Sequence, residues 1–199
     1  MTIVLGLTGS IGMGKSTVAA MFRKQGVPLF DADAEVRRLQ GPGGALLGAI
    51  EKLHPGTTGP EGVDRVRLGA AVLGDRSALR RLEYLVHPEV EKARRVFLRR
   101  HRARRLVVVD VPLLFEKGGW RRVDLIAVVS APAWKQNMRV LARDGMSWKK
   151  LEQVRALQLA DSAKRRRADF VIPTGGSLDA TRAAVRRVIA ACKGAAIGG

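Results

Sequence analysis

The segment LTGSIGMGKST, residues 7–17, decides which fold this sequence can adopt. Within it, Gly9-x4-Gly14-Lys15-Ser16 has the spacing of a P-loop, a glycine-rich turn whose successive N–H groups point at phosphate oxygens. The apolar run Thr2–Leu7 predicts a strand before the loop, and Lys15–Gln25 predicts a helix after it. The positive end of the helix dipole faces the same oxygens. The segment therefore predicts a site for a nucleoside triphosphate.

Two side chains of this loop have specific roles in the prediction. Lys15 adds a full positive charge that reaches the β- and γ-phosphates, and Ser16 offers a hydroxyl ligand for Mg²⁺. A chance glycine-rich turn is the alternative, and the flanking strand and helix argue against it. The predicted ATP-binding residues are Gly9, Ser10, Ile11, Gly12, Met13, Gly14, Lys15, Ser16 and Thr17.

Strand-like and helix-like segments alternate along most of the chain, which predicts a parallel sheet covered by helices. The run that begins at Leu106 is continuously apolar, as a strand buried on both faces requires. The expected fold class is α/β, with a P-loop NTPase-type parallel five-stranded sheet. The predicted strands are Thr2–Leu7, Val27–Phe30, the start of Leu106–Phe115, Val123–Ser130 and Ala168–Ile172. The helices predicted between and after these strands, apart from residues 41–104, are Lys15–Gln25, Pro132–Asp144, Trp148–Leu159 and Leu178–Cys192.

Two helical insertions interrupt this alternation. Residues 41–104 show helical patterns and no convincing strand, so we expect a helical insertion between the second and third strands. Residues 138–164 predict a shorter insertion, a helical hairpin that would act as a lid. The remaining residues, 1–40, 105–137 and 165–199, would form the nucleotide-binding core of a single unit.

The composition narrows the class of protein. The formal net charge of +18 favours anionic partners such as nucleotides, coenzymes or nucleic acid, although arginine-rich usage alone also produces it. The basic runs Arg94–Arg105 and Arg165–Arg167 lack interleaved aromatic residues, so we interpret them as solvated helix faces rather than a nucleic-acid surface. The sequence has no apolar run of about 18 residues and no signal peptide, and Cys192 is its single cysteine. We therefore expect a cytoplasmic protein with no membrane contact. We also favour a monomer.

Four acidic residues follow predicted strands, at the edge of the sheet where ligands bind in open α/β folds. Asp31 or Asp33 can accept the proton of an attacking hydroxyl, and either can instead cap the next helix; position favours the functional role for Asp33 and leaves Asp31 open. Asp110 ends the third strand, where it can lie beside Ser16 and Mg²⁺ or cap a turn. Glu116 is equally consistent with a ligand contact and with an ordinary loop carboxylate.

Basic residues in the second insertion suggest a contact with phosphate. Arg139 and Arg143 lie four residues apart, which predicts one helix face that closes over a transferring phosphoryl group. Because the chain is rich in arginine, the residues alone favour a solvated face for both, and for Arg155. His87 precedes Pro88, a pair typical of a helix boundary. No cluster of His, Cys and Asp has metal-ligand spacing, so we expect no structural metal.

In their order along the chain, these pieces resemble the dephospho-CoA kinase family. The resemblance implies transfer of the γ-phosphoryl group of ATP, with Mg²⁺, to the ribose 3′-hydroxyl of dephospho-CoA, which yields CoA and ADP. The motifs that carry it lie between about Leu5 and Gly176 and read GLTGSIGMGKSTVA, DAD, HP, DVPLLFE, QNMRVLARD, RALQ and KRRRADFVI.

The resemblance also implies roles for single residues. Asp33 matches the general base of the family, and Arg139 and Arg143 match lid arginines that approach the ATP phosphates. The recurrent lid positions are Gln136, Arg155 and Gln158, and the residues expected on the acceptor side are Asp31, His87, Asp110, Leu113 and Glu116. The chain departs from the family at Pro173-Thr174, where an Asp-Asn pair near the adenine is usual; Pro173 offers no N–H group and Thr174 no amide.

Two other functions fit part of the pattern. A nucleoside monophosphate kinase shares the architecture, but DVPLLFE and the helical insertion argue against it. A P-loop module that binds RNA through basic patches, with the nucleotide as a switch, is the second alternative. The predicted lid with two arginines argues against a switch.

Overall fold

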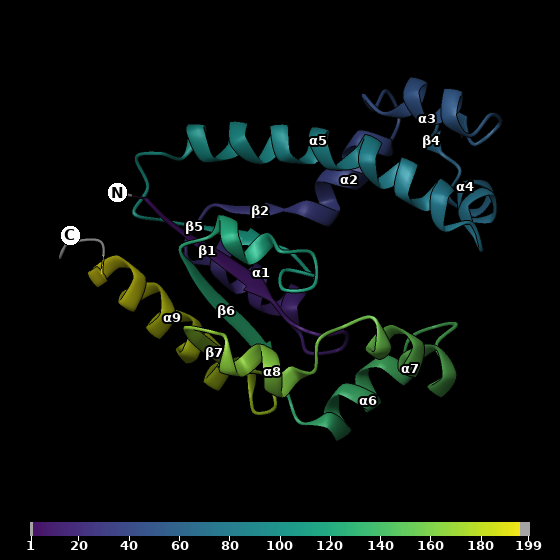
Figure 1. Ribbon diagram of the computed structural model, residues 1–199. Helices are drawn as coiled ribbons and strands as arrows, with labels where there is room; N and C mark the ends of the chain where they lie inside the picture. Colours follow the sequence, from purple (N-terminus) through teal and green to yellow (C-terminus); the bar gives the residue numbers. More distant parts are fainter. Residues whose placement is uncertain (1, 196–199) are drawn as a thin grey trace. The chain divides into compact units, whose positions relative to one another are not determined.

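The computed structural model describes residues 2–195 and divides the chain into two compact units (Figure 1). Unit 1 consists of Met1–Phe30 and His101–Gly199, and unit 2 of Asp31–Arg100. The elements that build unit 1 are β1 (Ile3–Thr8), α1 (Lys15–Lys24), β2 (Leu29–Asp31, whose last residue begins unit 2), β5 (Leu106–Asp110), the 3₁₀ helix η1 (Gly119–Arg122), β6 (Leu125–Ser130), α6 (Ala133–Leu141), α7 (Trp148–Ala156), α8 (Asp161–Arg166), β7 (Phe170–Pro173) and α9 (Leu178–Ala195). Those of unit 2 are α2 (Ala32–Gln40), α3 (Leu47–Leu53), β3 (Thr58–Gly59), β4 (Gly62–Val63), α4 (Arg65–Val72) and α5 (Arg76–Arg100).

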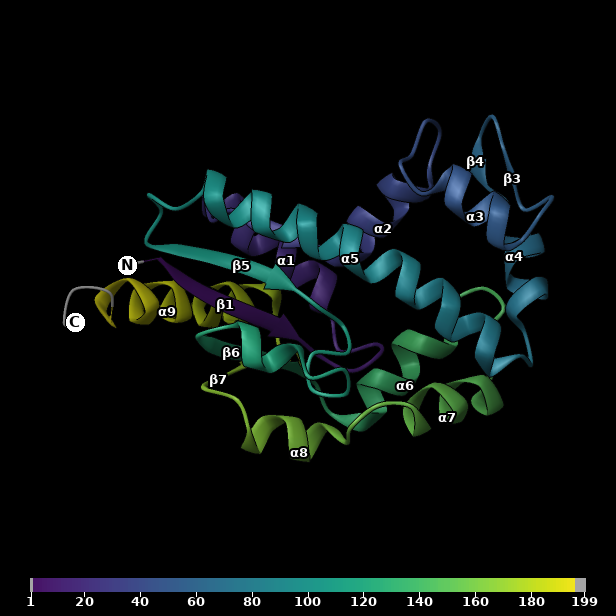
Figure 2. The ribbon, with the colours of Figure 1, turned by 45° about the horizontal axis from the view of Figure 1, so that its top comes forward.

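A five-stranded sheet in the order β2-β5-β1-β6-β7 forms the centre of unit 1. Strand β1 pairs in parallel with β5 and β6, and the three lie side by side in Figure 2. The connection from β1 leads to β2 on one side of the sheet, whereas the connection from the adjacent β5 leads to β6 on the other side. Such a switch point is where open α/β sheets bind ligands. The predicted α/β class and parallel sheet are confirmed.

Both faces of the sheet in unit 1 are buried. Leu7 of β1 packs with Phe22 of α1 and Val185 of α9 on one face. Val128 of β6 packs with Leu114 on the other face. This two-sided burial explains why the strands read as continuous apolar runs rather than alternating ones.

The single cysteine belongs to this core. Cys192 of α9 is fully buried in the same cluster as α1 and β1. Burial, together with the charge of Asp169, raises the pKa of its thiol to about 11. The residue therefore behaves as a small apolar side chain, as the sequence indicated.

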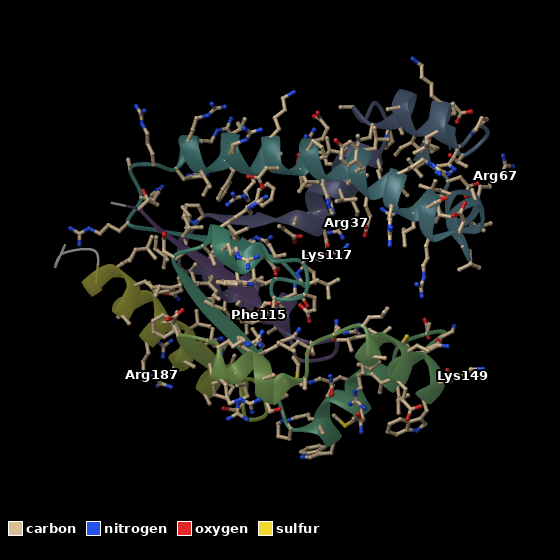
Figure 3. The ribbon with its side chains drawn as sticks, in the orientation of Figure 1. Arg37, Arg67, Phe115, Lys117, Lys149 and Arg187 are labelled. Carbon is tan, nitrogen blue, oxygen red and sulfur yellow. The ribbon has the colours of Figure 1, made fainter. Side chains whose placement is uncertain are left out.

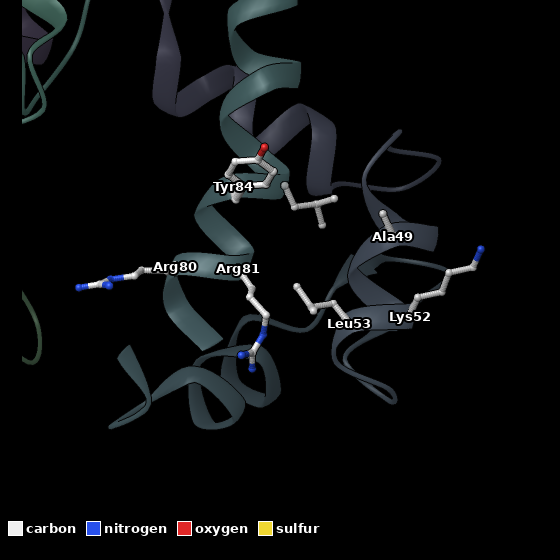
Figure 4. A pocket seen from close by; sticks show the side chains of 7 residues that line it. Ala49, Lys52, Leu53, Arg80, Arg81 and Tyr84 are labelled. Atoms are coloured by element: carbon white, nitrogen blue, oxygen red, sulfur yellow. The ribbon is translucent and has the colours of Figure 1, made fainter. Parts of the chain in front are cut away.

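Unit 2 has a core of its own. Leu39 of α2, Ile50 of α3 and Val86 of α5 are buried together. The unit begins at Asp31, earlier than residue 41, because α2 contributes to this core. An open pocket of about 590 Å³ lies in the unit (Figure 4), lined by Ala49, Lys52, Leu53, Arg80, Arg81, Tyr84 and Leu85.

Two expectations for this segment were wrong. Residues 41–104 do contain strands: β3 and β4 form an antiparallel pair whose two-residue strands are too short to show periodicity. Helix α5 also runs through His87-Pro88 instead of ending there. Pro88 has no N–H group to donate to the carbonyl of Tyr84, and this turn of the helix lies at the surface, where Tyr84 is 84% exposed.

Over residues 2–195, no helix combines the length and the apolar character needed to cross a bilayer. Two of the basic side chains of unit 1 that Figure 3 labels, Arg187 of α9 and Lys149 of α7, are exposed and extend away from the ribbon.

Candidate active site

The loop between β1 and α1 has the backbone conformation that its glycines allow. Gly12 and Gly14 have φ values of 76° and 86°, in the left-handed region that other residues rarely adopt. A Cβ atom on Gly12 would also lie 2.5 Å from Cγ2 of Val140. Gly14 is the N-cap of α1, and within the described residues no side chain caps it. The first N–H groups of α1 therefore remain available to a phosphate.

An ion pair joins this loop to the end of the neighbouring strand. Nζ of Lys15 lies 2.5 Å from Oδ1 of Asp110, the last residue of β5. The Asp110 side chain is only 4% exposed and that of Lys15 is 20% exposed. Leu7, just before the loop, pairs with Asp110 across the sheet, which places this carboxylate beside the loop. Two predicted site residues thus meet, while Ser16 and Thr17 are exposed on the first turn of α1.

Side chains from α6 and from the segment after β7 hold the outer side of the loop. Nε2 of Gln136 donates to the Ile11 carbonyl at 2.7 Å. Nη1 of Arg139 donates to the Gly12 carbonyl at 3.4 Å. The Thr174 hydroxyl donates to the third carbonyl of the series, that of Met13, at 2.6 Å.

Arg139 is fixed by the same threonine. Its Nη2 donates to the Thr174 carbonyl at 2.7 Å. Arg143 is exposed and lies beyond the end of α6, which ends at Leu141. The expectation that Arg139 and Arg143 share one helix face is therefore wrong, because the chain leaves the helix after Leu141 and turns over residues 142–145.

The linker between α7 and α8, residues 157–160, contacts the loop and the segment after β5. Oε1 of Gln158 accepts the N–H of Ile11 at 3.1 Å. The N–H of Leu159 donates to Oε1 of Glu116 at 2.8 Å. Arg155, at the end of α7, donates to Oε1 of Gln136 at 2.5 Å and also contacts Asn137. The three recurrent lid positions thus form one network around Ile11.

Glu116 has a buried partner that the sequence did not indicate. Nζ of Lys164, a fully buried residue of α8, lies 2.8 Å from Oε1 of Glu116, whose side chain is 15% exposed. Burial raises the pKa of Glu116, but the Lys164 ammonium and the Leu159 N–H outweigh it, and the net pKa is below the ordinary value. Glu116 is therefore an ionised carboxylate that anchors the linker.

The remaining predicted residues lie in three places. Asp31 caps α2, because its Oδ1 accepts the N–H of Ala34 at 2.8 Å, and Asp33 is exposed in the first turn of that helix. His87 is exposed on α5. These three belong to unit 2, whereas Leu113 is half-buried in the turn after β5 of unit 1.

Comparison with known proteins identifies the family. The sequence model described as dephospho-CoA kinase matches residues 3–180. The chain belongs to the dephospho-CoA kinase family. The dephospho-CoA kinase of Novosphingobium aromaticivorans is 56% identical over 96% of this chain and 94% of its own, and that of Mesorhizobium japonicum is 51% identical over 96% and 98%. The crystal structure of TT1252 from Thermus thermophilus matches with a TM-score of 0.83 and 36% identity over 96% of this chain and 97% of that one.

Membership of the dephospho-CoA kinase family confirms the predicted class, an ATP-dependent phosphotransferase. The sequence did not indicate the contacts of two residues of the site. Thr174 was noted only because the chain departs from the family pattern there, and Lys164 was not singled out. Their partners Met13 and Glu116 lie far away in the chain, so no local pattern indicates these contacts.

Proposed function

We propose that the chain transfers the γ-phosphoryl group of ATP to the ribose 3′-hydroxyl of dephospho-CoA, which yields CoA and ADP. The observation that carries this proposal is a complete P-loop, with its lysine paired to a buried carboxylate, in a chain that matches the dephospho-CoA kinase family over residues 3–180. A P-loop alone occurs in many enzymes, so the acceptor rests on the family.

In this proposal the phosphates of ATP lie on the backbone N–H groups of the loop. Lys15 leaves Asp110 for the β- and γ-phosphates, whose oxygens replace the carboxylate as its anionic partner. On closure, Nη1 of Arg139 would leave the Gly12 carbonyl, and Arg139 and Arg143 would stabilise the charge that spreads over the transferring group. Closure of the lid excludes water, which would otherwise accept the phosphoryl group. Asp31, His87, Leu113 and Glu116 are assigned to the acceptor side by the family resemblance.

The oxygen donors of the site suit Mg²⁺, which prefers few protein ligands alongside water and phosphate. Ser16 is exposed on the first turn of α1, and Asp110 supplies a carboxylate at the adjacent strand end. Residues 2–195 contain no group of three or more His, Cys, Asp or Glu side chains placed to hold a metal ion. Bound there, Mg²⁺ would neutralise charge on the β- and γ-phosphates.

An acceptor panel tests the proposed function. ADP formation is measured with ATP and Mg²⁺ against dephospho-CoA, AMP, CMP, adenosine and no acceptor. We expect turnover with dephospho-CoA alone. Turnover with AMP or CMP instead would favour a nucleoside monophosphate kinase, and ATP-dependent RNA binding without turnover would favour a switch. We further propose a cytoplasmic monomer without nucleic-acid or membrane partners.

Asp33→Asn tests the proposed general base. The substitution keeps the size of the side chain and removes its basicity, so we expect kcat to fall about 10²–10³-fold while the KM for ATP stays within about twofold. Glu35→Gln, two residues further along α2, is the matched control and should retain turnover. Near-normal kcat in Asp33→Asn would show that another group accepts the proton.

A further inference from the structure

The three carbonyl groups held on the outer side of the P-loop determine where its N–H groups point. In a trans peptide the carbonyl of one residue and the N–H of the next point in opposite directions. A side chain that fixes the Ile11 carbonyl therefore fixes the N–H of Gly12, and one that fixes the Met13 carbonyl fixes the N–H of Gly14. Gly12 and Gly14 make these peptides free to rotate when nothing holds them.

We propose that Thr174 and Gln136 are positioning residues for ATP: by holding the Met13 and Ile11 carbonyls outward, they aim the N–H groups of Gly14 and Gly12 at the phosphates. The inference rests on the proposed ATP site and concerns groups that need not touch the nucleotide. The proposal also assigns a function to Thr174, which lies where the sequence departs from the family pattern.

Thr174 is held in one orientation by its own backbone. The residue is 5% exposed, and its N–H donates to the Ser130 carbonyl at 2.8 Å. Its carbonyl accepts from Nη2 of Arg139 at 2.7 Å. A hydroxyl has one proton to donate, and the Met13 carbonyl at 2.6 Å is a better acceptor than the Ser130 carbonyl at 3.3 Å. The hydroxyl is thus directed at the loop.

Gln136 is oriented by an arginine. The side chain is 5% exposed, and its Oε1 faces Nη2 of Arg155 at 2.5 Å. A guanidinium only donates hydrogen bonds, so the amide oxygen must face Arg155 and the amide nitrogen must face the Ile11 carbonyl, 2.7 Å away. The amide nitrogen of Gln136 is thereby directed at the Ile11 carbonyl of the P-loop.

Thr174→Val removes the hydroxyl and keeps the shape of the side chain. We expect the Kd for ATP, measured by titration calorimetry without acceptor, to rise about tenfold, because binding must then reorient the Met13–Gly14 peptide. Thr174→Ser restores a hydroxyl donor and should bind ATP within about twofold of wild type. The KM for dephospho-CoA should stay unchanged in both variants.

Thr181→Val is the matched control. Thr181 is 2% exposed and its hydroxyl lies 3.1 Å from the carbonyls of both Pro173 and Ser177, so the control also loses a buried hydroxyl-to-carbonyl bond but none to the P-loop. A merely structural role of Thr174 predicts equal effects of the two substitutions on ATP binding. Equal Kd values for Thr174→Val and Thr181→Val, or a wild-type Kd in folded Thr174→Val, would overturn the proposal.

Gln136→Met tests the second carbonyl and keeps the test decisive should Thr174→Val not fold. It retains the length of the side chain and removes the donor to Ile11, so we expect a rise in the Kd for ATP of about the same size. Gln153→Met, at an exposed position of α7, is the control and should bind ATP normally. An unchanged Kd in Gln136→Met would contradict the proposal, and because calorimetry needs no acceptor, this outcome is distinct from failure of the proposed reaction.

Discussion

At the scale of the residue, the ion pair between Lys15 and Asp110 links stability to catalysis. Lys15→Met should lower kcat about 10²–10³-fold, since the charge on the transferring group loses its lysine. It should also lower the free energy of unfolding by about 2 kcal/mol, because the Asp110 carboxylate, 4% exposed, loses its cationic partner.

The double variant Lys15→Met/Asp110→Asn separates these effects. Replacing the carboxylate by a neutral amide should recover most of the lost stability in urea denaturation while turnover stays low. Full stability of Lys15→Met alone would show that the pair contributes little to folding in solution.

At the scale of the element, the linker between α7 and α8 depends on one buried ion pair. Glu116→Gln leaves the ammonium of the fully buried Lys164 without its anion, so we expect a loss of about 3 kcal/mol in the free energy of unfolding at pH 7. Glu152→Gln, at an exposed position of α7, should change stability little. Urea denaturation measures both.

The pH dependence of this contribution has a definite sign. The pKa of Glu116 is lowered in the folded protein, so the folded state binds its proton more weakly than the unfolded chain does. Its stabilisation is present above the unfolded pKa, about 4.3, and is lost as the pH falls through the folded value. Wild type should therefore lose its advantage over Glu116→Gln on acidification. A difference between them that does not change between pH 7 and pH 3 would contradict this assignment.

The elements also show what the sequence could and could not predict. The strands of the sheet and the P-loop were predictable, because apolar runs and the spacing of Gly9, Gly14 and Lys15 are local signals. The strands β3 and β4 were not, since two residues carry no periodicity, and neither was the passage of α5 through Pro88. The buried contacts of Thr174 and Lys164 were unpredictable for a different reason: they join segments far apart in the chain.

At the scale of the whole molecule, the net charge of +18 should oppose folding through repulsion among like charges. Salt screens this repulsion, with a Debye length of about 10 Å at 0.1 M. We therefore expect Tm to rise by a few degrees between 10 and 300 mM NaCl, measured by calorimetry without ligand. A Tm that falls with salt would show that attractive ion pairs outweigh the repulsion.

The most direct test of the central claim follows the phosphoryl group itself. ATP labelled in its γ-phosphate is incubated with the protein, Mg²⁺ and dephospho-CoA, and the product is analysed by mass spectrometry and ³¹P NMR. The account predicts that the label appears as a phosphomonoester on the ribose 3′-oxygen of CoA, with ADP formed in equal amount. Label found only as inorganic phosphate, or on another oxygen of the acceptor, would contradict it.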